Sequence, residues 1–299
     1  MYESYYGLTE KPFSIQPDPA FLYFSRRHRL AYTMLEYAIE NRAGFTVISG
    51  EVGVGKTTLI RRLLESLPES ATVGLVNNTH WAQTNLLAWV MQAFGQPFDA
   101  ISPQGLFDRF QRFLLAQYRE GRRVVLIVDE GQNLSPEALE ELRLLSNINA
   151  DKHLLLQVIL TGQPALAYLL SRPESQQFAQ RISVDFRLRP LLETEIQSYI
   201  EFRLSVAGRK KPLFTREACK AVGRFSEGVP RRINILCDTA LIYGMSYDRR
   251  IIDEPIIQEV IGDKLEFGIF SPMVSRDDLA KAIDELAAGR HVPSRTQKP

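Results

Sequence analysis

Apolar runs rich in β-branched residues recur along the first two thirds of the chain, and polar, Gly or Pro residues bound each run. Runs without polar alternation are typical of strands that a parallel sheet buries on both faces. These runs occupy residues 45–49, 71–77, 122–130, 153–162 and 181–188. Segments with helical spacing lie between them, so the pattern predicts an α/β fold with a doubly wound parallel sheet flanked by helices.

The segments between the predicted strands carry helix signals. In the segment after the run 122–130, Ser135 is suited to cap a helix and Pro136 to occupy its first position. Glu137 would then lie in the acidic first turn of this helix. Apolar residues at helical spacing predict further helices at 57–67, 84–94 and 103–118.

The strand pattern disappears at about Pro190. Beyond it the chain reads as helices separated by Gly or Pro, at residues 193–208, 215–228, 230–246 and 254–265. This change predicts an α/β core over residues 1–190 and a small all-helical domain over 191–265.

The last segment, residues 266–299, has a third character. DDLAKAIDELAAG places Leu279, Ile283 and Leu286 on one face, which predicts a short amphipathic helix, and the residues after it are expected to be disordered. The helix could be a docking peptide or could pack on its own domain.

Composition and charge narrow the class of protein. Lys plus Arg number 36 and Asp plus Glu 35, so no overall basic excess indicates nucleic acid or anionic lipid as a partner. The N-terminus does not resemble a signal peptide, and no apolar run reaches the roughly 18 residues of a membrane span. We therefore expect no integral membrane segment and a cytoplasmic protein, at most peripheral to a membrane. Cys219 and Cys237 lack metal-site spacing and are expected to be buried thiols.

GEVGVGKTT follows the first predicted strand and opens the next helix. Its pattern G-x-x-x-x-G-K-[ST] is that of a phosphate-binding loop, whose backbone amides and helix N-terminus attract an anion. Lys56 would reach the β- and γ-phosphates of ATP, and the Thr57 hydroxyl would bind Mg²⁺. The residues predicted to bind nucleotide are Gly50, Glu51, Val52, Gly53, Val54, Gly55, Lys56, Thr57 and Thr58.

Two carboxylates end the strand RRVVLIVDE. Asp129 is suited to hold Mg²⁺ together with Thr57, and Glu130 is suited to act as the base that activates the attacking water. An acidic pair can also simply end a strand. The apolar run before the pair, and its position after the phosphate loop, favour an ATPase.

An α/β core followed by a helical lid resembles the AAA+ arrangement of ATPases, which suggests three further sites. Thr161 or Gln163, at the end of the next strand, would sense the γ-phosphate. In the lid, Arg231 at the start of a helix would do the same, with adjacent Arg232 as the alternative. Arg181, at the head of the last predicted strand, would be an arginine finger supplied to a neighbouring subunit.

Several longer segments resemble the general secretion pathway protein A family of AAA+ ATPases, whose relatives accompany pilus assembly or exopolysaccharide (PEP-CTERM) loci. The segments are MYESYYGLTEKPFSIQPDPAFLYFSRRH, GEVGVGKTT, VDEGQNLSPEALEELRLLSN, LTGQP, QRI and GVPRRINILCDTAL. The resemblance implies that Phe13 and residues 23–28 lie near the adenine, and that Tyr2 and Tyr5 pack the N-terminus onto the core. Secretion-type members continue into a transmembrane helix and a peptidoglycan-binding domain. This sequence ends at Pro299, so we expect it to fit the shorter, soluble subfamilies.

The expected function is Mg²⁺-dependent ATP hydrolysis by a homo-oligomer, a ring or filament, that serves a cell-envelope assembly system through partner proteins. The alternative is an ATP-dependent DNA-binding regulator of the kind that selects transposition targets. A local basic excess in the lid favours this alternative, because cations neutralise DNA phosphates. The basic residues are Arg209, Lys210, Lys211, Arg216, Lys220, Arg224, Arg231 and Arg232.

Overall fold

The computed structural model describes residues 1–77, 85–99, 101–150 and 153–266. They form two compact units. The first, which we call the α/β unit, is Arg26–Arg189. The second, which we call the helical unit, combines Met1–Ser25 with the chain from Pro190 on. The predicted amphipathic helix lies within residues 267–299, which are outside the described residues.

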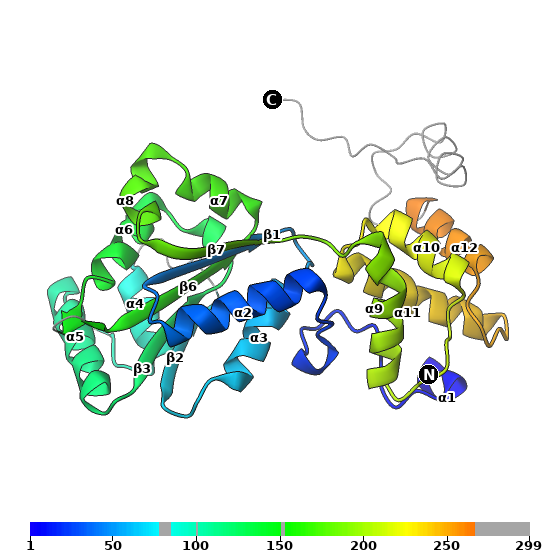
Figure 1. The fold of residues 1–299 in the computed structure, drawn as a ribbon, viewed down its shortest axis with the longest axis horizontal. Helices are drawn as coiled ribbons and strands as arrows, with labels where there is room; N and C mark the ends of the chain where they lie inside the picture. Colours follow the sequence, from blue (N-terminus) through cyan, green and yellow to red (C-terminus); the bar gives the residue numbers. More distant parts are fainter. Residues whose placement is uncertain (78–84, 100, 151–152, 267–299) are drawn as a thin grey trace. The chain divides into compact units, whose positions relative to one another are not determined.

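A five-stranded parallel sheet forms the centre of the α/β unit, with the order β2-β3-β6-β1-β7 (Figure 1). Every residue of β1 and β6 is buried, as the uninterrupted apolar runs predict, whereas buried and exposed residues alternate along much of the edge strand β7. The predicted doubly wound parallel sheet is confirmed. The strands are β1 (Phe45–Gly50), β2 (Ala71–Val76), β3 (Arg123–Val128), β6 (Leu156–Gly162) and β7 (Ile182–Leu188).

One predicted strand is divided in the structure. The run 153–162 supplies β6 only from Leu156 on, whereas β5 (His153–Leu154) pairs antiparallel with β4 (Asn149–Ala150). The Leu155 amide donates to the Ile148 carbonyl, so the chain turns back on itself before it enters the main sheet. The turn between β5 and β6 could not be predicted, because the apolar run in the sequence continues through it.

Helices cover both faces of the sheet because successive side chains of each strand point to opposite faces. Phe45 and Val47 of β1 share one buried cluster with apolar side chains of α4 to α8. On the opposite face, α2 and α3 lie side by side (Figure 1), and the Gln157 side chain of β6 donates to carbonyls at the end of α2. The helices are α2 (Arg26–Glu40), α3 (Lys56–Ser66), α4 (Leu86–Ala93), α5 (Pro103–Arg119), α6 (Pro136–Leu145), α7 (Pro164–Leu170) and α8 (Gln176–Ala179).

The predicted start of α6 is confirmed. The Ser135 hydroxyl accepts a hydrogen bond from the Ala138 amide at 3.2 Å, Pro136 is the first helical residue and Glu137 lies in the first turn. This cap fixes where the chain enters the helix after the strand that carries the two carboxylates.

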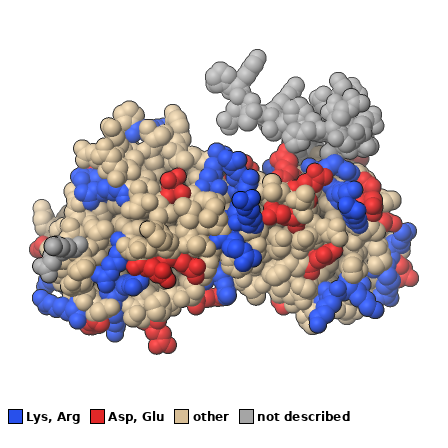
Figure 2. Space-filling model, in the orientation of Figure 1, with Lys and Arg blue, Asp and Glu red and all other residues tan. Residues whose placement is uncertain are grey.

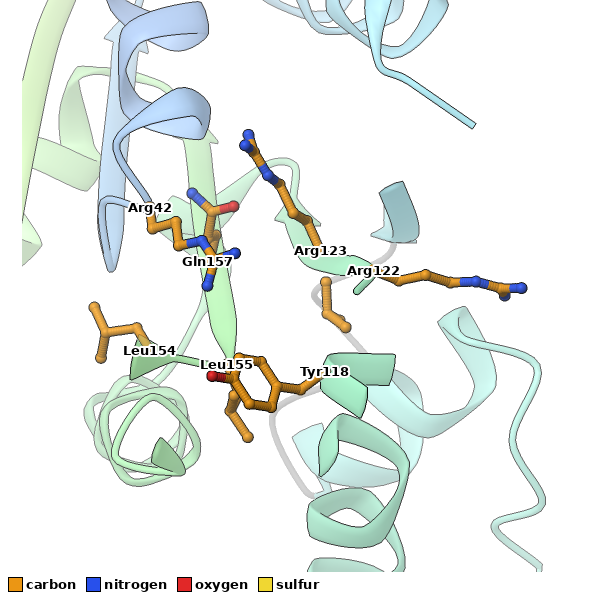
Figure 3. Close-up of a pocket in the computed structure, with 8 residues that line it drawn as sticks. Arg42, Tyr118, Arg122, Arg123, Leu154, Leu155 and Gln157 are labelled. Carbon is orange, nitrogen blue, oxygen red and sulfur yellow. The ribbon is translucent and has the colours of Figure 1, made fainter. Parts of the chain in front are cut away.

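A small pocket lies where β3 and β6 begin, and three arginines line part of it (Figure 3). The Arg123 guanidinium donates to the Ile39 carbonyl at 3.2 Å, and Gln157 donates to the Ala38 and Ile39 carbonyls. The same two carbonyls, in the last turn of α2, also accept from the backbone amides of Arg42 and Ala43. The arginine and the glutamine therefore have a structural role at the end of the sheet opposite the phosphate loop.

The helical unit encloses a second apolar core. Its elements are α1 (Tyr2–Tyr6), η1 (Pro19–Phe21), α9 (Glu193–Val206), α10 (Arg216–Ser226), α11 (Pro230–Ser246) and α12 (Glu254–Glu266). Cys219 and Cys237 are both free and buried in this core, as expected. Burial raises the pKa of the Cys219 thiol to about 12 and that of Cys237 well above its ordinary value.

The N-terminal segment belongs to the helical unit, which corrects the expectation that Tyr2 and Tyr5 pack it onto the α/β core. The Tyr2 hydroxyl donates to Asp238 of α11, and the Tyr5 hydroxyl donates to Asp248 at 2.7 Å. Phe13, expected near the adenine, is 1% exposed and meets Phe214 edge to face in the core of this unit. The aromatic residues before the first strand show no helical or strand spacing, so the sequence does not indicate whether they pack in the α/β unit or in the helical unit.

Candidate functional site

The predicted phosphate loop connects β1 to α3, and its glycines are required by the backbone. Gly53 and Gly55 have φ of 84° and 102°, a region that residues with a side chain adopt rarely. A Cβ on Gly50 would lie 2.5 Å from the Leu188 carbonyl oxygen of β7. The loop can therefore follow this path only with glycine at these positions.

Lys56 is the first residue of α3, and its side chain folds back over the loop. Its Nζ donates to the Gly50 and Glu51 carbonyls at 2.8 and 3.0 Å, and the residue is 6% exposed. Burial lowers the pKa of Lys56, whereas the nearby carboxylates of Glu130, Asp129 and Glu51 raise it. An ammonium group therefore lies beside the first amides of α3, which have no acceptor within the helix. Together they fit an anionic phosphate.

Asp129 follows β3 and joins the phosphate loop to the neighbouring strands. Because β6 lies between β1 and β3, the ends of all three strands meet at one edge of the sheet. Thr57 donates to Oδ2 of Asp129 at 3.1 Å, and the Thr161 hydroxyl of β6 donates to Oδ1. The predicted pair of Thr57 and Asp129 is thus brought together. Hydroxyl and carboxylate oxygens are ligands that suit Mg²⁺.

Glu130 has an uncommon backbone conformation. Its φ of 54° and ψ of 39° lie in the left-handed region, where residues other than glycine are infrequent and cluster at functional sites. Its Oε2 accepts from Gln132 Nε2 at 2.6 Å and from Gln163 Nε2 at 3.4 Å. Two side-chain amides therefore hold the carboxylate beside Asp129.

The two candidate γ-phosphate sensors have different surroundings. Thr161 is fully buried, and its hydroxyl is bonded to Asp129. Gln163 is half-buried, with its side-chain amide on Glu130 and its backbone amide on Gln132. Thr161 is therefore placed to orient Asp129, and the role of Gln163 as a sensor stays a prediction.

Comparison with known proteins agrees with this arrangement. A family model described as an AAA domain matches residues 39–170, which contain the loop, both carboxylates and the end of β6. General secretion pathway protein A of Aeromonas hydrophila is 44% identical over 243 residues, an alignment that covers 81% of this chain and 44% of the relative. The chain contains the AAA domain of P-loop ATPases. The chain spans less than half the length of that relative. The resemblance to the general secretion pathway protein A family that the sequence predicts is confirmed.

Solved structures show the AAA+ fold independently of sequence. Cdc6p from Pyrobaculum aerophilum has a TM-score of 0.65 at 13% identity, covering 96% of this chain and 87% of its own. ORC2 from Aeropyrum pernix has a TM-score of 0.60 at 18% identity, covering 90% of this chain and 81% of its own. At these identities the likeness concerns the fold.

In this AAA+ ATPase, Arg181 lies far from its own phosphate loop. It immediately precedes β7, whose first residue Ile182 is in register with Phe45, whereas Leu188 at the other end is in register with Gly50. Five residue steps along β1 correspond to about 16 Å. Arg181 therefore lies at the opposite end of the sheet.

The lid arginines differ in their contacts. Arg231 and Arg232 are both exposed in the first turn of α11. Arg232 forms an ion pair with Glu227 at 2.7 Å, whereas no ion pair of Arg231 occurs among the described residues. This difference favours Arg231 as the arginine available to a nucleotide, and its role stays a prediction.

Sequence reasoning missed Gln132, and it included His28 only in the stretch 23–28 expected near the adenine. Gln132 carries one clear signal, an amide side chain two residues after a carboxylate at a strand end. His28 of α2 carries no sequence signal for its contact with the loop, because its partner Val54 is 26 residues away and contributes only a backbone carbonyl.

Among the residues that the structure describes, no helix is both long and apolar enough to cross a membrane.

Proposed function

We propose that this AAA+ ATPase hydrolyses ATP with Mg²⁺ as a homo-oligomer and thereby powers or regulates a cell-envelope assembly system. The systems in question are protein secretion, pilus assembly and exopolysaccharide export. The observation that carries the chemistry is the meeting of Lys56, Thr57, Asp129 and Glu130 at one edge of the sheet. The similarity to general secretion pathway protein A supports the cellular role. The protein would act in the cytoplasm, held near the inner membrane by a partner.

Each residue of the site has a proposed task. The amides of residues 50–58 and the Lys56 ammonium bind the phosphates, and Thr57 and Asp129 hold Mg²⁺. When bound, the metal offsets negative charge on the β- and γ-phosphates. Glu130 accepts a proton from water.

The hydrogen bonds around Glu130 support its role as the base. Gln132 and Gln163 both donate to Oε2, and these two bonds fix the direction of the carboxylate. The left-handed backbone at Glu130 turns the chain directly after β3, so that this side chain leaves the sheet at the edge where the loop lies. Gln163 would report the γ-phosphate through the same carboxylate.

The charges of the helical unit support an envelope function over DNA binding. On the face shown in Figure 2, basic and acidic side chains are interspersed over this unit. Within the basic segment, Arg209 donates to the Tyr6 carbonyl, and Arg224 pairs with Glu254 at 2.9 Å. Cations engaged in this way are less available to phosphates along a DNA backbone.

The test compares two variants as baits in native cells. Glu130→Gln should retain bound ATP, because the amide cannot accept the proton, whereas Lys56→Ala should not bind ATP tightly. After isolation with ATP, components of a secretion, pilus or exopolysaccharide system should accompany Glu130→Gln and be absent with Lys56→Ala.

A second measurement addresses the DNA-binding alternative. The wild-type protein is titrated with duplex DNA in the presence of ATP at two salt concentrations. Tight, steeply salt-dependent retardation, together with no envelope component on the Glu130→Gln bait, would replace the proposed role with DNA binding.

A further inference from the structure

His28 makes a direct contact with the phosphate loop from a different element. It is the third residue of α2, is 3% exposed, and its Nε2 lies 2.9 Å from the Val54 carbonyl oxygen. A carbonyl oxygen only accepts hydrogen bonds, so Nε2 must carry the hydrogen and the imidazole must donate. The side chain therefore holds one particular carbonyl of the loop.

The loop is fixed on both sides of this contact. The Val54 side chain is fully buried, although the residue belongs to a loop. Gly55 follows with a φ of 102°, and a Cβ on it would lie 3.2 Å from His28 Nε2. The imidazole thus packs directly on the Gly55 backbone and holds the Val54–Gly55 peptide by contact as well as by a hydrogen bond.

The orientation of this peptide determines where an amide hydrogen points. The Val54–Gly55 bond is trans, and in a planar trans peptide the C=O and the following N–H point in opposite directions. The Val54 carbonyl points toward His28 on α2, so the Gly55 amide points away from α2. Among the described residues, no backbone carbonyl accepts this amide hydrogen.

We propose that His28 is a positioning residue that aims the Gly55 amide at the phosphates of the bound nucleotide by fixing the Val54 carbonyl. This inference rests on nucleotide binding by the AAA domain and adds to it a residue outside the loop motif. A preset amide costs no reorganisation when the anion binds, whereas a rotating peptide must be ordered at that moment.

The test measures the affinity of the purified protein for a fluorescent ADP by titration and the free energy of unfolding by urea denaturation. His28→Phe keeps a flat ring of similar shape and removes the donor. We expect it to weaken ADP binding about 5- to 30-fold, the range for one oriented hydrogen bond to a charged group. His28→Gln retains an N–H donor and should bind ADP within about threefold of wild type.

Tyr32→Phe is the matched control. Tyr32 lies on the same helix, and its hydroxyl donates to Ser66 Oγ of α3 at 2.8 Å. This variant should lose stability of the same order as His28→Phe and keep wild-type affinity for ADP.

Two results would overturn the proposal. One is wild-type affinity for ADP in folded His28→Phe, and the other is an equal loss of affinity in Tyr32→Phe, which would make the role of His28 merely structural. If His28→Phe does not fold, His28→Gln decides, because weak ADP binding by this folded variant would contradict a donor role. Absence of ADP binding by the wild type itself would instead refute the proposed ATPase.

Discussion

The arginine that completes the active site should come from a neighbouring subunit. Phosphoryl transfer spreads charge over the γ-phosphate oxygens, and an arginine finger stabilises this charge. Arg181 is the candidate, but it lies about 16 Å along the sheet from its own phosphate loop, the length of five strand residues. A single side chain does not bridge that separation within one chain. Replacing Arg181 with Ala should therefore leave ATP binding intact and remove hydrolysis.

The size of the expected loss follows from the role of the finger. Such an arginine contributes about 10³–10⁵ in rate, which is roughly 4–7 kcal/mol of activation free energy. The Arg181 guanidinium donates to the hydroxyl of the buried Ser146 at 3.2 Å, and we expect docking of a neighbouring subunit to break this bond. Steady-state phosphate release, measured over a range of protein concentrations, should rise in specific activity as the oligomer forms.

Mixing two inactive variants makes the test sharp. Arg181→Ala keeps an intact Glu130, and Glu130→Gln keeps an intact Arg181, so a mixed oligomer contains some complete sites. With random mixing in equal amounts, about a quarter of the head-to-tail interfaces are complete, and about a quarter of wild-type activity should return. Arg62→Ala, which removes an exposed arginine paired with Glu65, should keep full activity as a control. Full activity of Arg181→Ala alone, or turnover by a proven monomer, would refute the reasoning.

Four other outcomes are expected. Lys56→Ala should abolish tight ATP binding with little change in unfolding free energy, measured by nucleotide titration and urea denaturation; micromolar affinity would contradict its role. Glu130→Gln should bind ATP and lose at least about 10²-fold in turnover, measured by phosphate release. Arg231→Ala should make proteolysis after residue 190 independent of nucleotide, while Arg232→Ala should not. The Cys219 thiol, with its raised pKa, should react with a thiol reagent at pH 8 only after unfolding.

Much of the fold could be predicted because it follows from local patterns. The five parallel strands and the helices of the lid repeat apolar residues at the spacing of their own secondary structure, so each segment reports its state without its neighbours. The N-terminal segment could not be assigned in this way. Tyr2 is bonded to Asp238, 236 residues away, and only the folded chain shows that this contact exists.

The residues of the candidate site likewise fall into those that local sequence patterns predict and those that only the folded structure shows. The glycines, Lys56 and Thr57 are contiguous in the chain, so spacing alone predicts their chemistry. Asp129 could be predicted from its place after an apolar strand. The contact of His28 with the loop could not be predicted, because its partner is a backbone carbonyl, a group that every residue has.

The position of β6 explains why the scattered residues form one site. It separates the strand that precedes the phosphate loop from the strand that precedes Asp129, so its own end lies between the two. Thr161 at this end bonds Asp129, and Gln163 two residues later bonds Glu130. A change at the γ-phosphate would therefore reach both carboxylates through a single strand end. This arrangement gives the Gln163 side chain its proposed role as sensor, because the amide that would contact phosphate already contacts the base.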